Sequence, residues 1–116
     1  MNKSNNKEIT DNLDALIAAP YNHTLILENE KVRVLDTIIR AGDSTPMHTH
    51  ACPSVFYIIS WSDFVRYDGE GNVLVDTRKR ENGEVPPSVL WSEPLGLHSV
   101  ENVGDADLHV IGIEIK

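Results

Sequence analysis

The chain has 116 residues, with 10 Lys and Arg against 18 Asp and Glu, so its formal net charge at pH 7 is −8. A chain of this length buries roughly two thirds of its unfolded surface, which supports one hydrophobic core and therefore one domain. The acidic residues are spread along the sequence, and no basic stripe is present that would neutralise phosphates. This distribution excludes nucleic acids and membrane surfaces from the expected partners.

The sequence shows no targeting segment at its start. Residues 1–7 are polar, and no run approaches the roughly 20 apolar residues needed to span a bilayer, so we expect neither a secretory signal nor a transmembrane helix. Cys52 is the only cysteine, so no intrachain disulfide can form and a reducing compartment is favoured. We therefore expect a cytoplasmic protein.

A short helix is predicted near the N-terminus. Thr10 is a candidate N-cap for a helix over residues 11–19, in which Leu13, Leu16 and Ile17 share one face. Because no other helical pattern follows, this helix is expected to be an arm attached to the main domain.

Beyond residue 20 the sequence consists of short apolar-polar alternations separated by turn residues, which is typical of an all-β domain. The predicted strands, in chain order, cover residues 23–27, 32–40, 54–61, 63–67, 73–77, 89–92, 98–103 and 108–115. Turn signals near every tenth residue favour an antiparallel sandwich or barrel. We therefore divide the chain into a tail and short helix at residues 1–20 and a β-barrel domain at residues 21–116.

His48 and His50 are the first candidate functional residues. Side chains two positions apart on a strand leave the same face, so both imidazoles can enter one coordination sphere. Imidazole suits Zn, Fe, Ni, Mn or Cu, and the pair does not choose among them. Among the other histidines, His98 is the best placed third ligand, because it follows a glycine-containing turn at residues 94–97 and opens a predicted strand. The alternative is a pair of solvated or hydrogen-bonded histidines.

The residues around these histidines resemble two motifs of the cupin superfamily. The first motif, Gly, five residues and His-x-His, matches residues 42–50, and the second, Pro-x-Gly, a short gap, His, three residues and Asn, matches residues 94–102 with a gap of one. The resemblance extends over residues 32–116. It implies a single, jelly-roll-like antiparallel β-barrel that holds one divalent metal ion (Fe, Zn, Ni or Mn) through His48, His50 and His98.

The chain departs from the cupin pattern at two positions. The glutamate of the first motif is replaced by Ser54, and its second glycine by Trp61. Loss of the anionic ligand leaves three histidines and an additional open position on the metal. This arrangement resembles the three-histidine cupins, which include thiol dioxygenases. The alternative is a degraded site that holds no metal.

Five further residues are candidates for substrate contacts or for supporting the ligands: Cys52, Ser54, Phe56, Trp91 and Asn102. The parity of His48 and His50 would turn Ser54 and Phe56 toward the cavity, where Phe56 would be a pocket wall or a core residue. Cys52 is a candidate fourth ligand or a small buried residue. Trp91 would line the barrel mouth, the core or a dimer interface. Asn102 faces inward with the third histidine or forms hydrogen bonds in a turn.

The two remaining histidines are assigned lesser roles. His23 precedes the first strand and is expected to be exposed. His109 shares a face of the last strand with Ile111, Ile113 and Ile115, so it is expected to be a satisfied core or interface residue. An acid-base role for His109 remains open if the strand crosses the cavity.

Two classes of function are compatible with these residues. The first is a metal-dependent enzyme, dioxygenase-like or isomerase- or lyase-like, that acts on a small organic acid or thiol. The second is a non-catalytic small-ligand binder or sensor that retains the barrel without the chemistry. In either case the resemblance implies a homodimer, with the strand at residues 23–27 as the candidate pairing edge.

Overall fold

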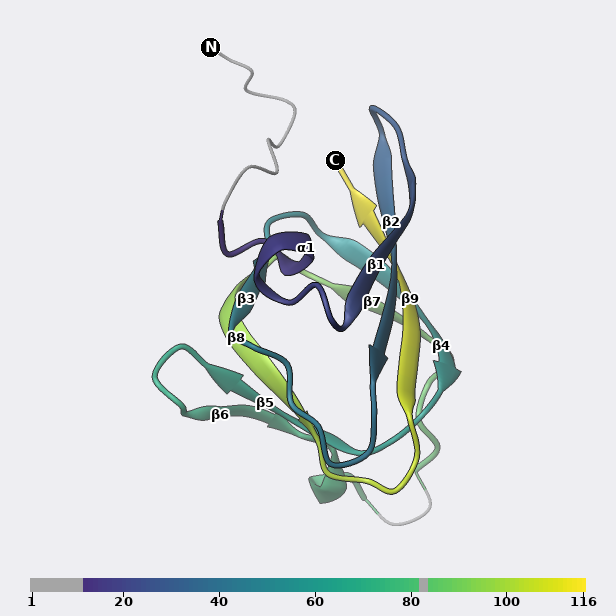
Figure 1. Ribbon diagram of the computed structural model, residues 1–116. Coiled ribbons are helices and arrows are strands. Elements are labelled where there is room, and N and C mark those ends of the chain that lie inside the picture. Colours follow the sequence, from purple (N-terminus) through teal and green to yellow (C-terminus); the bar gives the residue numbers. More distant parts are fainter. Residues whose placement is uncertain (1–11, 82–83) are drawn as a thin grey trace.

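Two antiparallel β-sheets face each other in the computed structural model, which describes residues 12–81 and 84–116 (Figure 1). One sheet has five strands in the order β1-β2-β9-β4-β7, and the other has four in the order β3-β8-β5-β6. The strands are β1 (His23–Glu28), β2 (Val32–Ile39), β3 (His48–His50), β4 (Ser54–Ser60), β5 (Phe64–Asp68), β6 (Val73–Asp76), β7 (Val89–Ser92), β8 (Leu95–Asn102) and β9 (Leu108–Ile115). This architecture confirms the predicted all-β, jelly-roll-like class.

The predicted strand positions agree with the structure to within one residue at each end, except before His98. Strand β8 begins at Leu95, so the predicted turn at residues 94–97 is wrong and His98 lies inside the strand rather than at its start. The reason is tertiary pairing with β3, in which His48 pairs with His98 and His50 pairs with Leu95. The pairing with β3 keeps residues 95–97 in an extended conformation, including Gly96.

Helix α1 (Ala15–Ala18) is a single turn and is shorter than predicted. Asp14 is its N-cap, and its Oδ2 accepts a hydrogen bond from the backbone N–H of Leu16 at 3.1 Å. The predicted cap, Thr10, and the predicted first residue, Asp11, lie outside the described residues. Asp14 therefore takes the capping role that the sequence pattern assigned to a position four residues earlier.

Helix α1 packs through alanines rather than through its larger apolar residues. Ala15 and Ala19 are fully buried, whereas Leu13 and Ile17 remain 43% and 56% exposed, so the predicted apolar face is not the buried one. The small side chains let the turn approach β1 and β3 closely, and the backbone N–H of Thr49 in β3 donates to the Leu13 carbonyl at 2.7 Å. The turn thereby lies beside β1 and β3 at one end of the barrel (Figure 1).

The hydrophobic core lies between the two sheets. Its buried members are Ile39, Val100 and Leu108, with Phe64 and Val110 packed against them. These residues come from β2 and β9 in one sheet and from β5 and β8 in the other, so the core holds the two sheets together. In the described part of the chain, no helix is long and apolar enough to cross a membrane.

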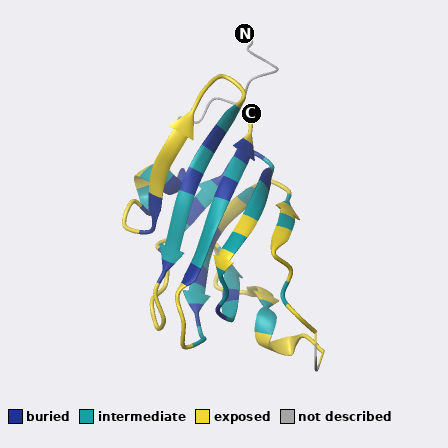
Figure 2. Ribbon diagram, turned by 90° about the vertical axis from the view of Figure 1, so that its right-hand side faces the viewer, coloured by how far each residue is buried: buried dark blue, intermediate teal, exposed yellow. Residues whose placement is uncertain are grey.

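The outer face of the five-stranded sheet carries a continuous apolar row. Adjacent residues across the strands pair as Leu27 with Val34, Val34 with Ile113, Ile113 with Val55, and Val55 with Trp91. Figure 2 looks onto this sheet, in which the exposed strand β1 is largely yellow. Trp91 is 58% exposed at one end of the row and Leu27 is 49% exposed at the other. A large part of this apolar face is therefore in contact with solvent in the single chain.

Candidate metal centre

A cavity of about 90 Å³ lies between the two sheets. Apolar and aromatic side chains supply most of its lining, and a smaller polar group completes it. The polar group includes His23, His48, His50, His98 and Arg66.

The four histidines form one compact cluster. The His48 ring centroid lies 4.3 Å from that of His98, 5.0 Å from that of His50 and 4.9 Å from that of His23. The His50 ring lies 5.5 Å from His23 and 5.4 Å from His98. One ligand atom from each of His23, His48 and His50 lies within 4.8 Å of the other two, a spacing at which these three histidines can hold a metal ion. His98 is outside that tightest group and flanks two of its members.

The expectation that His23 is exposed is wrong. It is the first residue of β1, it is only 5% exposed, and its ring lies edge-on to those of His48 and His50. Its position depends on the turn after α1, because its backbone N–H donates to the Ala19 carbonyl at 3.2 Å. The sequence contained no local signal for this role, since a histidine at the start of an edge strand is ordinarily solvated.

Hydrogen bonds fix the orientation of all four rings in the same way: each Nδ1 faces an oxygen acceptor. The acceptors are the carbonyl oxygens of Ala19 for His23 (3.0 Å), Pro46 for His48 (2.8 Å) and Gly96 for His98 (2.7 Å), and the carboxylate of Glu114 for His50 (3.0 Å). A carbonyl oxygen only accepts, so Nδ1 carries the hydrogen and Nε2 carries the free lone pair in the three histidines with backbone partners. Such fixed tautomers are a usual feature of metal-ligating histidines.

Burial keeps three of these imidazoles neutral. Desolvation lowers the pKa of His23 to about 4, that of His48 to about 3 and that of His98 to about 4, although the hydrogen bond to a backbone carbonyl opposes the shift in each case. Neighbouring histidines lower these pKa values further, because two imidazolium charges would repel each other. At neutral pH the lone pairs are therefore available to a metal without prior loss of a proton.

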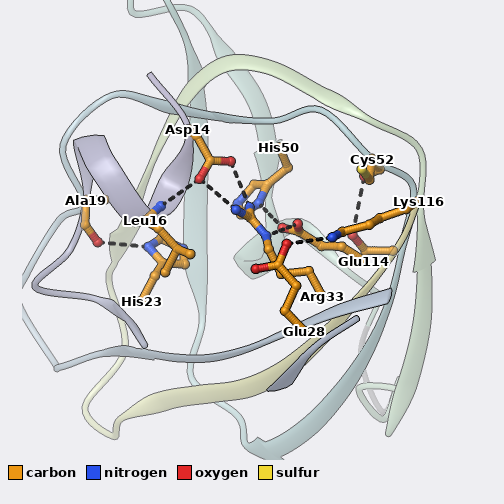
Figure 3. Close-up of polar contacts among 11 residues, drawn as sticks. Asp14, Leu16, Ala19, His23, Glu28, Arg33, His50, Cys52, Glu114 and Lys116 are labelled. Carbon is orange, nitrogen blue, oxygen red and sulfur yellow. Dashed lines mark hydrogen bonds and ion pairs between the residues drawn. The ribbon is translucent and has the colours of Figure 1, made fainter. Parts of the chain in front are cut away.

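Glu114 links His50 to a buried ion-pair network (Figure 3). One carboxylate oxygen accepts from Nδ1 of His50 at 3.0 Å, and the other accepts from Nε of Arg33 at 2.8 Å. The guanidinium of Arg33 also donates to both oxygens of Asp14, at 3.0 and 2.7 Å. All four side chains are buried, so His50 is held by a chain of charged groups that reaches the N-cap of α1.

The charges in this network stabilise one another. Burial opposes ionisation of Glu114, but the hydrogen bonds from His50 and Arg33 outweigh it and lower the pKa of the carboxyl group. Burial also disfavours the Arg33 cation, and its hydrogen bonds to Asp14 and Glu114 outweigh that effect and raise the pKa of the guanidinium. The network had a partial signal in the sequence, because Arg33 and Glu114 each share strand parity with buried apolar residues.

The residues predicted to contact the substrate or to support the ligands do not all reach the cavity. Phe56 lines the cavity. Ser54 is buried but does not line it, and its hydroxyl donates to the Cys52 carbonyl at 3.4 Å. The Cys52 side chain is buried as well. Trp91 lies on the outer face and donates from Nε1 to Glu93, so the prediction that it lines the barrel mouth is wrong.

Asn102 has a structural role in the turn between β8 and β9. Its Nδ2 donates to the carbonyls of Ile39 and Ala106, both at 2.8 Å, and its Oδ1 accepts from the hydroxyl of Ser62 at 2.7 Å and the backbone N–H of Gly104 at 3.0 Å. All four hydrogen bonds are within the protein, so the side chain joins the β8–β9 turn to the end of β2 and to the loop after β4.

His109 points away from the cavity. Its Nε2 contacts the carboxylate of Asp36 at 2.5 Å, and its neighbours Leu108 and Val110, rather than His109 itself, line the cavity. The face of β9 that contains His109 and the isoleucines is therefore the outer face. Gly112 lies on the inner face, where an added Cβ would meet the Phe56 ring at 3.0 Å. Gly112 therefore leaves room for the Phe56 ring on the inner face.

No protein-family model and no curated protein matches the sequence. Solved structures do match the fold. A cupin domain from Bordetella pertussis Tohama I superposes with a TM-score of 0.60 at 23% identity, covering 81% of this chain and 91% of that one. A protein with a double-stranded β-helix domain from Klebsiella pneumoniae gives 0.57 at 16% identity, covering 80% and 74%. An RmlC-like cupin family protein from Methanocaldococcus jannaschii gives 0.55 at 10% identity, covering 80% and 79%.

These similarities define the class of protein by its fold. The chain has the cupin fold, also called the double-stranded β-helix, as its two motifs indicate. Within this fold it carries a cluster of histidines that can hold a metal ion.

Proposed function

We propose that this chain binds one divalent transition-metal ion through His48, His50 and His98, with His23 as a fourth nitrogen donor. The observation that carries the proposal is the convergence of four buried imidazoles on one cavity, each with its Nδ1 engaged by an oxygen acceptor. Burying four such groups against one another is unfavourable unless a ligand uses their lone pairs. In this assignment His23 supplies the donor that Ser54 does not.

The donor set restricts the metal. Three or four neutral imidazoles, with no carboxylate among the lining residues described, suit Fe, Zn or Ni, whose borderline character favours nitrogen ligands, better than Mn, which prefers oxygen ligands. The bound cation keeps its full charge, because none of these ligands is anionic. A cation of this kind attracts a negatively charged or electron-rich substrate and acts on it as a Lewis acid or, if it is iron, as a redox centre.

The function that follows is a metal-dependent enzyme acting on a small organic acid or thiol. The cavity of about 90 Å³ accommodates only a small molecule, and most of its lining is apolar. The residues of this chain would bind the metal and orient the substrate against Phe56. Glu114 would hold the His50 ring in its ligating orientation.

A non-catalytic binder or sensor is the second candidate. It is favoured by the position of Ser54, whose hydroxyl hydrogen bonds to the Cys52 carbonyl rather than lining the cavity. The two candidates differ in turnover. An enzyme loses its activity with a chelator and recovers it with one particular metal, whereas a binder shows ligand affinity without product formation.

Metal content tests the proposed site. Protein purified without a polyhistidine tag is loaded with Zn²⁺ or Fe²⁺, passed through a desalting column and measured by elemental analysis. We expect one metal ion per chain in the wild type and in His109→Ala, whose histidine pairs with Asp36 outside the cavity. His48→Ala should lose the metal, and His23→Ala should bind it more weakly. Equal metal in the wild type and His48→Ala would disprove the site.

We also propose that the chain forms a homodimer through the apolar outer face of the five-stranded sheet. The face spans all five strands and presents Leu27 and Trp91 to solvent. A continuous apolar surface on a sheet is typical of a protein–protein interface. The same apolar face of a second copy of the chain can pack against it in a symmetric dimer.

A further inference from the structure

Arg66 is the cationic side chain that lines the cavity in the described part of the chain. It lies on β5, where it pairs with Val100 on β8, and Val100 shares its face of that strand with His98. Residues diagonally opposite on neighbouring strands are within about 7–8 Å of each other, which is within reach of a long side chain. The guanidinium of Arg66 and the imidazole of His98 therefore face one cavity from adjacent strands.

The guanidinium of Arg66 has no anionic partner among the described residues. Its Nε is buried without a hydrogen-bond acceptor, and its contact within the protein is with the Phe64 ring, whose centroid lies 5.8 Å from Cζ. The other four arginines differ in this respect, because each forms an ion pair with Asp or Glu: Arg33, Arg40, Arg78 and Arg80.

This lack of a partner is unusual given the composition of the chain. Acidic residues outnumber basic ones by 18 to 10, yet no carboxylate is among the described residues that line the cavity. Burial without such a partner lowers the pKa of the Arg66 guanidinium. A cation in this environment is costly in the empty protein, and an anionic ligand that enters the cavity removes that cost.

We propose that Arg66 anchors the carboxylate of a small ligand, whose other end carries a hydroxyl, carbonyl or thiol group directed at the histidines. The planar fork of a guanidinium matches a carboxylate with two parallel hydrogen bonds, which gives both affinity and orientation. This inference rests on the proposed function and narrows its substrate class to small carboxylates. It makes Arg66 a residue that determines specificity, whichever metal the histidines bind.

Glycolate and glycolamide are matched probes for this anchor, because they carry the same hydroxyl group and differ in the charge of the other end. Isothermal titration calorimetry of the zinc-loaded protein should show that glycolate binds, and that the affinity for glycolamide is at least tenfold lower. Arg66→Gln should weaken glycolate binding by roughly tenfold to a hundredfold and abolish the preference, as expected for a lost charge-assisted hydrogen bond. Arg66→Lys should retain part of the preference, since it keeps the charge and loses the fork.

Arg78→Gln is the control, because it removes one positive charge from an exposed residue that pairs with Asp76. It should bind glycolate like the wild type. Elemental analysis of every variant separates this inference from the proposed metal site. If the wild type holds no metal, the metal proposal fails, and the same titrations on the metal-free protein still test Arg66. Equal glycolate affinity in the wild type, Arg66→Gln and Arg66→Lys would overturn the anchor, as would a wild type with no preference for glycolate.

Discussion

Removal of the Arg33 cation should destabilise the fold more than any surface substitution, because it leaves two buried carboxylates without their partner. Asp14 and Glu114 have side chains that are 3% exposed, and Arg33 bridges them with bonds of 2.7 to 3.0 Å. Breaking a buried ion pair by deleting one member costs about 3–5 kcal/mol. At about 4 °C per kcal/mol for a chain of this size, Arg33→Met should lower Tm by about 12–20 °C.

Differential scanning calorimetry of the metal-free protein measures this loss, with Arg78→Met as an exposed control that should leave Tm nearly unchanged. A triple variant, Arg33→Met with Asp14→Asn and Glu114→Gln, removes the unpaired charges and should recover a large part of the loss.

The loss of stability in Arg33→Met should also depend on pH. The lowered pKa of Glu114 means that its stabilising contribution is present above its ordinary value of 4.5 and is lost below it. The difference in Tm between the wild type and Arg33→Met should therefore become smaller as the pH falls below about 5. A Tm within 3 °C of the wild type would refute the assignment of the network as a stabilising unit.

Two further predictions concern the histidines and the outer face. The metal-free protein should lose stability as the pH falls from 6.5, because a histidine such as His23, with a pKa of about 4, takes up a proton in the unfolded state before the folded one. Each such histidine costs about 2 kcal/mol between pH 7 and pH 5, so urea unfolding should show a steep decline in stability that is smaller in His23→Gln. A flat profile would contradict the burial of neutral imidazoles. Trp91→Lys should convert the proposed dimer to a monomer in size-exclusion chromatography with light scattering, and Leu74→Lys, on the exposed edge strand of the other sheet, should not. A monomeric wild type, or dissociation by the Leu74 variant alone, would count against the interface.

Local patterns in the sequence predicted the strands well. Alternation with period two and turn residues placed seven of the eight predicted strands within one residue at each end, because these signals depend on neighbours in the chain. Where pairing with a distant strand decided the conformation, as for the segment before His98, the local turn signal failed. The single turn of α1 is a second case, since its buried alanines matter only through the strands they touch.

The candidate site was predictable in part. Spacing placed His48 and His50 on one face of a strand, and the resemblance to the two cupin motifs made them candidate ligands together with His98. His23 did not follow from any pattern, and strand parity gave only a partial signal for Glu114, because each acquires its role from a residue far away in the chain. Similarly, the parity of β9 identified two faces, but the more apolar one turned outward.

The sequence by itself determined which segments are extended and which side chains share a face, since a strand repeats every two residues whatever surrounds it. Only the tertiary structure decided which face turns inward and which charged groups meet there. Those outcomes depend on how two sheets pack, and a buried Arg33 is stable only because its two carboxylate partners arrive from residues 19 and 81 positions away. The free energy of such a network belongs to the assembled barrel, because no short segment of the chain contains all of its members.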